Sequence, residues 1–491
     1  MEATAEGFAV QREATSASEA TATGAPDVAS PDGRAGAAAG RPPASGSHRN
    51  RAERGWGHSW VMAVLALVVA VEVLAVVVFG SITAVRYPLW SIVDEGAHFD
   101  NIAYIAEHGS LPVLGKTLAN EQVLAIAQGV YPRHTTIDPR TDGLGGLSYE
   151  AFQPPLYYLV ATPVYFLSGN YHTKAILLRF FGLFLLLVAI ALLARLSRLV
   201  LRERWLAGLA GGLLVLLMPG FVVRMVTISN MALAVPILIA TVTELWIAWQ
   251  RASPRRLVAA GILVGCSVLT DLYLAELVPV LLAVTISILV RRRTRRDVMW
   301  SATGGALAAL LVLPWVVFNE VEYGALTAGN LVKAEQTPII NPDHLRHTVS
   351  QLPGLTVQNL FHPLMPQEWG AALASHALLS YLASTFEVLL VPAALVLALA
   401  LGRRLFTTGY WILILPWLGN VVICWYVQIG QQWQGLVARY TYPSLAVLGL
   451  FVVAAALSFT RSVKPVVATI ATSTLFLVGL WVHLLPAIRT S

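Results

Sequence analysis

The feature that most constrains this chain is a series of long apolar runs separated by short segments rich in arginine. A helix of roughly 20 apolar residues is long enough to cross the hydrocarbon core of a bilayer. Only 12% of the 491 residues are charged and 56% are hydrophobic, whereas a soluble globular protein has about a quarter of its residues charged. The sequence therefore predicts an all-α polytopic membrane protein.

The apolar runs predict eleven membrane-spanning helices, and the arginine clusters between them orient the chain. Positively charged segments are retained in the cytoplasm. With eleven spans the clusters all fall on the cytoplasmic side, so the N-terminus is cytoplasmic and the C-terminus lies outside. The predicted spans are residues 60–85, 173–196, 205–224, 230–250, 256–270, 272–290, 298–318, 376–401, 407–428, 438–459 and 465–486.

The remaining segments divide the chain into a tail and a membrane domain. Residues 1–55 are rich in Ala, Gly, Ser, Thr and Pro and have no apolar period, so they predict a disordered cytoplasmic tail. Residues 56–491 form the membrane domain, with outer loops at 86–172, 319–375 and 429–437. The basic residues are explained by this topology, so no nucleic-acid partner is expected.

A short apolar segment at residues 153–166 differs from the spans because it contains Pro154, Pro155 and Pro163. Proline interrupts helical hydrogen bonding, and irregular backbone at membrane depth must be buried in protein. We expect an interfacial or re-entrant helix here. If residues 155–169 crossed the membrane instead, every arginine cluster would lie outside, against the usual bias.

The candidate chemistry begins at Asp94-Glu95-Gly-Ala-His98, directly after the first span. Charged groups at a membrane face are costly and usually functional. A carboxylate there can act as a general base toward a hydroxyl, or it can hold a divalent cation. Asp94 and His98 share one helix face and could provide two metal ligands, but no third ligand is evident. A divalent cation is therefore an open alternative, and no cofactor is established.

Glycosyl transfer is one reaction that uses such carboxylates, because the attacking hydroxyl must lose a proton while the anomeric carbon becomes cation-like. If the donor is a sugar linked to a lipid phosphate, the leaving group is an anionic phosphate that needs a cation or N–H donors. Arg439, at the outer start of a predicted helix and next to Tyr440, is a candidate for that charge. Tyr157 and Tyr440 also fit an interfacial aromatic belt.

Together these segments resemble the type-C (GT-C) glycosyltransferase superfamily, and more closely a bacterial integral-membrane branch of it. The resemblance rests on Asp94-Glu95-Gly-Ala-His98, on Tyr149-Glu-Ala-Phe-Gln153-Pro-Pro-Leu-Tyr157-Tyr158 and on Ala438-Arg439-Tyr440. Known members use polyprenyl-phosphate-linked sugars and carry an acidic pair in the first outer loop. The resemblance implies catalytic roles for Asp94, as the base, and for Glu95 in support. The residues expected to bind substrate are His98, Gln153, Tyr157, Arg439 and Tyr440.

The resemblance implies transfer of a sugar from a polyprenyl-phosphate carrier to a glycan, lipid or protein of the cell envelope, at the outer face of the plasma membrane. Two departures leave alternatives open. Met231 stands where related sequences often have an acid, and Asp271 stands where a lysine is common. A non-catalytic assembly protein that keeps the fold is one alternative, and a transporter or flippase of lipid-linked sugars is the other.

Overall fold

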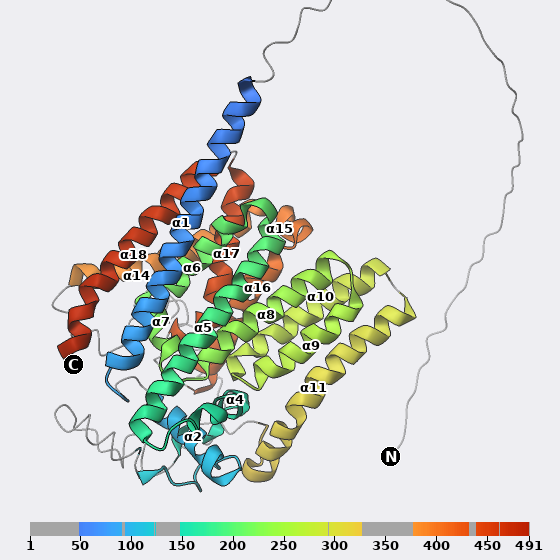
Figure 1. The fold of residues 1–491 in the computed structure, drawn as a ribbon. Helices are drawn as coiled ribbons and strands as arrows, with labels where there is room; N and C mark the ends of the chain where they lie inside the picture. Colours follow the sequence, from blue (N-terminus) through green and yellow to red (C-terminus); the bar gives the residue numbers. More distant parts are fainter. Residues whose placement is uncertain are drawn as a thin grey trace, which may run out of the picture. The chain divides into compact units, whose positions relative to one another are not determined.

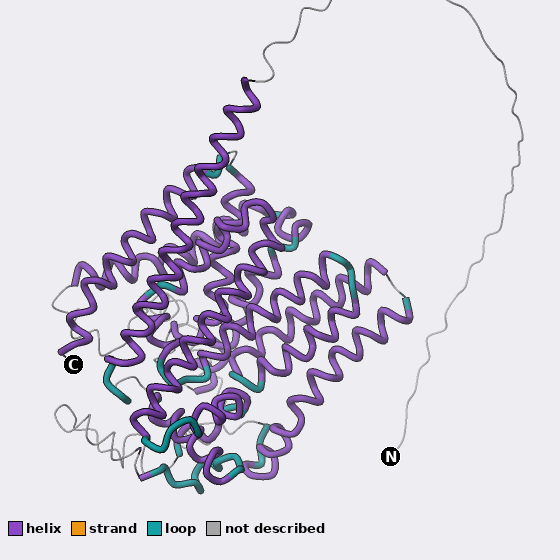
Figure 2. Tube along the Cα trace, in the orientation of Figure 1, coloured by secondary structure: helices purple, strands orange, loops and turns teal. Residues whose placement is uncertain are grey.

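The computed structural model describes residues 49–90, 94–121, 123, 148–292, 294–326, 377–431, 438–460 and 462–490 (Figure 1). The chain divides into residues 1–54 and 55–491, and the fold below is that of the second unit. The described residues form helices and connecting loops without a strand (Figure 2), so the predicted all-helical fold is confirmed for this part. The predicted tail, up to residue 48, lies outside it.

The helices follow one another along the whole described chain. They are α1 (Arg49–Arg86), α2 (Glu95–His108), η1 (Tyr149–Phe152), α4 (Leu156–Tyr165), α5 (Tyr171–Leu201), η2 (Arg202–Arg204), α6 (Trp205–Leu216), α7 (Pro219–Val226), α8 (Met231–Gln250), α9 (Pro254–Val268), η3 (Leu272–Glu276), α10 (Leu277–Arg292), α11 (Arg295–Tyr323), α14 (Ala377–Leu401), α15 (Arg403–Thr408), α16 (Trp411–Gln431), η5 (Ala438–Thr441), α17 (Tyr442–Phe459) and α18 (Lys464–Thr490).

Seven segments of the described chain are long and apolar enough to cross a bilayer, which makes this a multi-pass membrane protein. One of the seven, Tyr171–Leu216, contains both α5 and α6, which pack against each other after the turn at η2. Shorter apolar helices lie at Leu389–Leu401 and Trp411–Ile423. The number of eleven spans stays a prediction.

Two predicted spans are each interrupted. The predicted helix at 205–224 breaks between α6 and α7, where Pro219 begins the second helix. Proline has no N–H to donate and fits the first turn of a helix, so it starts a new helix here. The predicted helix at 407–428 breaks between α15 and α16 at Gly409, whose φ of 86° is open to glycine but unfavourable for other residues.

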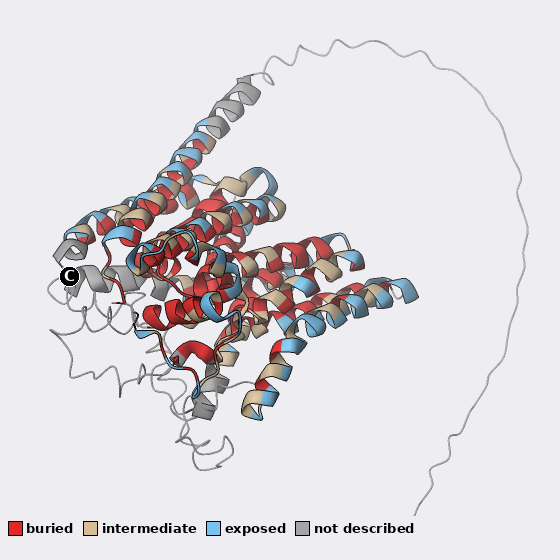
Figure 3. Cartoon of the chain, turned by 60° about the horizontal axis from the view of Figure 1, so that its bottom comes forward, coloured by how far each residue is buried: buried red, intermediate tan, exposed pale blue. Residues whose placement is uncertain are grey.

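Burial identifies the centre and the edge of the bundle (Figure 3). In the most apolar window of α8, 89% of the residues are buried, and α8 packs against α5, α9 and α17. The corresponding share in α11 is 11%, so most side chains of this helix face outward. An apolar helix with exposed apolar side chains is expected to face lipid.

α11 contacts α9 through glycine residues, which let the two backbones approach closely. A Cβ added at Gly304 would lie 2.4 Å from the carbonyl oxygen of Leu257, which is far inside van der Waals contact. The neighbouring Gly305 faces open space, where a Cβ would meet no atom within 4 Å. A substitution at Gly304 therefore changes both helix packing and helix propensity, whereas a substitution at Gly305 changes helix propensity alone.

We predict that Gly304→Ala lowers the free energy of unfolding by about 1–3 kcal/mol, because the methyl group must push α9 and α11 apart. Gly305→Ala is the matched control and should be neutral or stabilising by up to roughly 1 kcal/mol, because alanine favours a helix more than glycine does. Thermal unfolding of the two purified variants in detergent measures the difference. Equal midpoints would contradict the close approach at Gly304.

Candidate functional site

An apolar cluster, separate from the main core, fixes α2 and α4 against one end of α5 and α8 (Figure 1). It contains Phe99 and Ile102 of α2, Tyr157 and Ala161 of α4, and Leu178 of α5. The interfacial or re-entrant segment expected at 153–166 is thus a short packed helix. α2 begins at Glu95, so one acid of the pair is in its first turn and the other, Asp94, is the residue directly before it.

Asp94 caps the start of α2 in the left-handed region, with φ 74°. Its carbonyl oxygen accepts the N–H of His98 at 2.9 Å, and its side chain is half-buried. Trp90 also has a positive φ, 62°. Such conformations cost roughly 1–3 kcal/mol per residue and persist where the surroundings impose them, often at functional sites. The backbone on both sides of residues 91–93 is therefore held in place by neighbouring contacts.

The strongest of those contacts is a buried ion pair between Glu95 and Arg179 of α5. Arg179 Nε lies 2.7 Å from Glu95 Oε1, and Nη2 lies 2.7 Å from Oε2. Both side chains are inaccessible to solvent. A bidentate pair of this kind fixes geometry as well as charge, because two parallel N–H groups meet two oxygens.

The rest of the Arg179 guanidinium binds the chain segment that leaves α1. Nη1 donates to the carbonyl oxygens of Tyr87 at 2.5 Å and Ala84 at 3.5 Å, and Nη2 donates to that of Pro88 at 3.0 Å. All five N–H groups of the arginine are thus used. The side chain joins the end of α1 to the first turn of α2.

The Glu95 carboxylate is equally saturated. Besides Arg179, Oε2 accepts the backbone N–H of Trp90 at 3.1 Å, and Oε1 accepts that of Ile228 at 3.2 Å, in the turn between α7 and α8. A carboxylate occupied in this way has no oxygen left for a substrate. The two adjacent acids therefore differ: Glu95 is fully buried and holds the backbone, while Asp94 precedes the helix and is half-buried.

His98 and Tyr157 lie in the wall of the site. His98 is buried, and its Nδ1 is 2.8 Å from the hydroxyl oxygen of Tyr158 on α4. Tyr157 is 0% exposed. Burial raises the pKa of its hydroxyl, and the nearby charge of Glu95 adds to this shift. Both side chains contribute packing at this end of the bundle, and Tyr157 offers no open surface.

Gln153 lies at the junction of three elements. Asn230 donates through Nδ2 to Gln153 Oε1 at 3.4 Å and to the carbonyl oxygen of Thr270 at 3.4 Å. The N–H of Leu156 donates to the carbonyl oxygen of Leu269 at 2.9 Å, across from α4 to the end of α9. The Pro-Pro segment is therefore fixed to the start of α8 and to the end of α9.

Met231 and Asp271, the two departures from the resemblance described above, flank this junction. Met231 begins α8 and is buried. Asp271 directly precedes η3 and caps it, because its Oδ1 accepts the N–H of Tyr273 at 2.9 Å. Tyr273 in turn stacks on Tyr440, with ring centroids 4.2 Å apart. Tyr440 therefore reaches the same end of the bundle as Gln153, whereas the side chain of Arg439 lies outside the described residues.

The structure brings Glu95, His98, Gln153, Tyr157 and Tyr440 to one end of the bundle, with Asp94 at the start of α2. Arg179 was not among the predicted site residues. An arginine inside an apolar run is the signal that could have indicated it, because a charge at that depth needs a partner. In the described part of the chain, no group of three His, Cys, Asp or Glu side chains is placed to hold a metal ion.

Neither the scan against protein-family models nor the search of curated proteins found a match. Among solved structures, the chain is similar to the oligosaccharyltransferase of Archaeoglobus fulgidus in complex with zinc and sulfate. The two are 14% identical with a TM-score of 0.47, over 86% of this chain and 53% of the other. This chain thus spans about half the length of that protein.

The chain is also similar to ArnT from Cupriavidus metallidurans bound to undecaprenyl phosphate, at 15% identity and a TM-score of 0.35, over 85% of this chain and 78% of that one. A third similar structure is the Archaeoglobus fulgidus oligosaccharyltransferase AglB with an inhibitory peptide and a dolichol-phosphate. The two chains are 15% identical with a TM-score of 0.43, over 89% of this chain and 56% of the other.

We predict that Arg179→Lys lowers the free energy of unfolding by about 3–5 kcal/mol, because one ammonium cannot replace five directed N–H donors in a buried site. The matched control is Arg195→Lys. Arg195 pairs with Glu244 at 3.0 Å but is 51% exposed, so its replacement should change stability by about 1 kcal/mol or less. Thermal unfolding in detergent compares the two, and a similar loss in both variants would argue against the structural role of Arg179.

Proposed function

We propose that this protein is a membrane glycosyltransferase of the GT-C type. It moves a sugar from a polyprenyl-phosphate carrier to a cell-envelope acceptor at the outer face of the plasma membrane. The observation that carries the proposal is the strained backbone of Asp94, which the buried Glu95–Arg179 pair holds beside the turn between α7 and α8. Strain maintained at this cost is a common mark of a functional site.

In the proposed reaction, Asp94 accepts the proton of an acceptor hydroxyl while the hydroxyl oxygen attacks the anomeric carbon. A new glycosidic bond forms and the bond from that carbon to the phosphate oxygen breaks. The electron pair leaves with the polyprenyl phosphate, whose added negative charge Arg439 stabilises. The proton stays on Asp94 until it is released to solvent, so the step needs no oxidant or reductant.

The other site residues have positioning roles in this proposal. Glu95 keeps Asp94 in its conformation through Arg179 and Ile228. His98 orients the helix against α4 through Tyr158. Gln153, next to Asn230, and Tyr440, stacked on Tyr273, border the place for the donor headgroup. Tyr157 supports that wall from within the core.

We predict that Asp94→Asn lowers sugar transfer by about 100-fold or more, because asparagine cannot accept the proton and a general base contributes 10²–10⁴-fold. The assay is release of radiolabelled sugar from a panel of undecaprenyl-phosphate sugars, with a cell-envelope fraction as acceptor. Asparagine also tolerates a positive φ, so the variant should fold.

Glu320→Gln, at an exposed residue of α11, is the control and should transfer at the wild-type rate. Full activity in Asp94→Asn would show that Asp94 is not the base. If the wild type moves the labelled lipid across the bilayer of proteoliposomes but transfers no sugar, the transporter is favoured. If it does neither, the non-catalytic assembly protein is favoured.

Arg439→Gln should weaken binding of undecaprenyl phosphate about 10-fold or more, because a hydrogen bond to a charged group contributes roughly 1.5–3 kcal/mol. The control is Arg404→Gln, at an exposed arginine of α15. The dissociation constant is measured by titrating undecaprenyl phosphate into each purified variant. Equal constants for both variants would place the phosphate elsewhere.

A further inference from the structure

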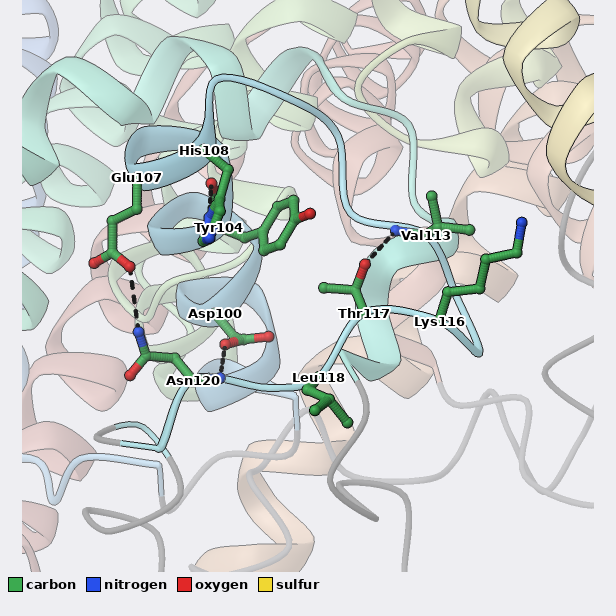
Figure 4. Close-up of a pocket in the computed structure, with 9 residues that line it drawn as sticks. All are labelled: Asp100, Tyr104, Glu107, His108, Val113, Lys116, Thr117, Leu118 and Asn120. Carbon is green, nitrogen blue, oxygen red and sulfur yellow. Dashed lines mark hydrogen bonds between the residues drawn. The ribbon is translucent and has the colours of Figure 1, made fainter.

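A cavity of about 530 Å³ lies beside the C-terminal half of α2, between this helix and the loop that follows it (Figure 4). Asp100, Tyr104 and His108 line it from α2, and Leu118 and Asn120 line it from the loop. The three helix residues are spaced by four, so they share one face. The cavity is therefore distinct from the surface at Asp94, which lies six residues before Asp100, or about 9 Å along the helix axis.

Asp100 contributes an unsatisfied acceptor to this cavity. The residue is 2% exposed, and its Oδ1 accepts the backbone N–H of Asn120 at 2.8 Å. Oδ2 accepts no hydrogen bond from the described residues, because the nearby hydroxyl of Ser148 donates to Asn101 Oδ1 instead. In Figure 4 this second oxygen points to the space between Tyr104 and Leu118. A buried oxygen without a partner is unfavourable by about 1–3 kcal/mol, and a ligand hydroxyl would remove that penalty.

Burial raises the pKa of the Asp100 carboxyl, and the hydrogen bond from the backbone N–H of Asn120 offsets only part of this shift. A carboxyl that is protonated more readily can donate a hydrogen bond as well as accept one. This matches a ligand whose groups are hydroxyls, which do both.

The aromatic rings of Tyr104 and His108 line the same side of the cavity as Asp100. The rings of Tyr104 and His108 stack with centroids 4.3 Å apart and planes within 17° of parallel. The apolar C–H face of a sugar ring packs on such a surface while its hydroxyls reach polar groups at the edge. Leu118, 72% exposed, covers part of the opening with an apolar side chain.

The floor of the cavity is rigid, because its polar groups are held by other helices. Asn120 Nδ2 donates to the hydroxyl oxygen of Tyr171 at 3.0 Å and lies 3.4 Å from Glu107 Oε2. Glu107 Oε1 accepts hydrogen bonds from the hydroxyls of Tyr165 and Tyr171. Asn120 and Glu107 are therefore fixed to α4 and α5 before any ligand arrives, as a preformed site requires.

The charges at the rim disfavour an anion. Asp100 and Glu107 are both acids, and the amine of Lys116 is 2.8 Å from Glu322 Oε2 of α11, which satisfies its charge. A phosphate or carboxylate would meet two carboxyl groups and one cation that is already paired. A neutral polyhydroxyl ligand meets no such repulsion.

We infer that this cavity binds a sugar ring of a carbohydrate acceptor, at a distance from the hydroxyl that Asp94 activates. That the sugar belongs to an acceptor rests on the proposed glycosyl transfer. The binding of a neutral sugar ring rests on the cavity alone, with its unpaired buried oxygen, its aromatic wall and its fixed amide.

The test is saturation-transfer NMR on the full chain in detergent, without any donor. The probes are the methyl glycosides of α-D-mannose, β-D-galactose and β-D-glucose. Leu118→Trp fills the cavity from an exposed position, and Asp100→Asn removes the ionisable carboxyl with little change of shape. Glu320→Gln, at an exposed acid outside the cavity, is the matched control. Thermal unfolding checks that each variant is folded.

At least one glycoside should bind the wild type and the control alike. Its affinity should fall about fivefold or more in each cavity variant, as expected when a hydrogen bond worth about 1 kcal/mol is lost or the space is filled. The inference is overturned if no glycoside binds the wild type, or if a folded Leu118→Trp binds as well as the control. Because no donor is present, these results are independent of whether the wild type transfers sugar.

Discussion

The buried pair of Glu95 and Arg179 is the interaction on which this end of the molecule depends. Two opposite charges removed from water are favourable only when every oxygen and N–H group has a partner. Here the partners come from Tyr87 just after α1, from Trp90 in the connection to α2 and from the turn between α7 and α8. Elements distant in sequence must therefore meet at the same time, and the loss of any one of them leaves a buried charge unsatisfied. The pair couples the acidic motif to the membrane helices.

This coupling explains why two adjacent carboxylates can have different roles. Glu95 is the first residue of α2 and is fully buried in the network, whereas Asp94 has a left-handed backbone and is half-buried. A helix that began one turn later would leave both acids in a loop with no fixed geometry. The backbone strain at Asp94 and at Trp90 is thus maintained by the saturated contacts of Glu95, which accepts the N–H of Trp90 directly.

The apolar runs were enough to predict the helical membrane fold, and Asp94-Glu95 and Gln153-Pro154-Pro155 were enough to predict where polar groups gather. The break at Pro219 could have been read from the sequence, because proline starts helices more readily than it continues them. The division of roles between the acids could not, because Arg179 is 84 residues from Glu95 in the chain. The cavity was also missed, although the spacing of Asp100, Tyr104 and His108 on α2 was a usable signal.

α2 thus carries a strained acid before its first turn and a polar cavity along its last turns. Its N-terminal half is fixed by a buried ion pair and by His98 against α4. Its following loop meets α11 through the exposed Lys116–Glu322 pair and through the N–H of Leu114, which donates to the hydroxyl oxygen of Tyr323 at 3.0 Å. Exposed ion pairs contribute little stability, so the side of the cavity facing α11 is held more weakly than the side facing α4. A bulky ligand that approached from that side would displace a few surface contacts and leave the geometry of Asp94 intact.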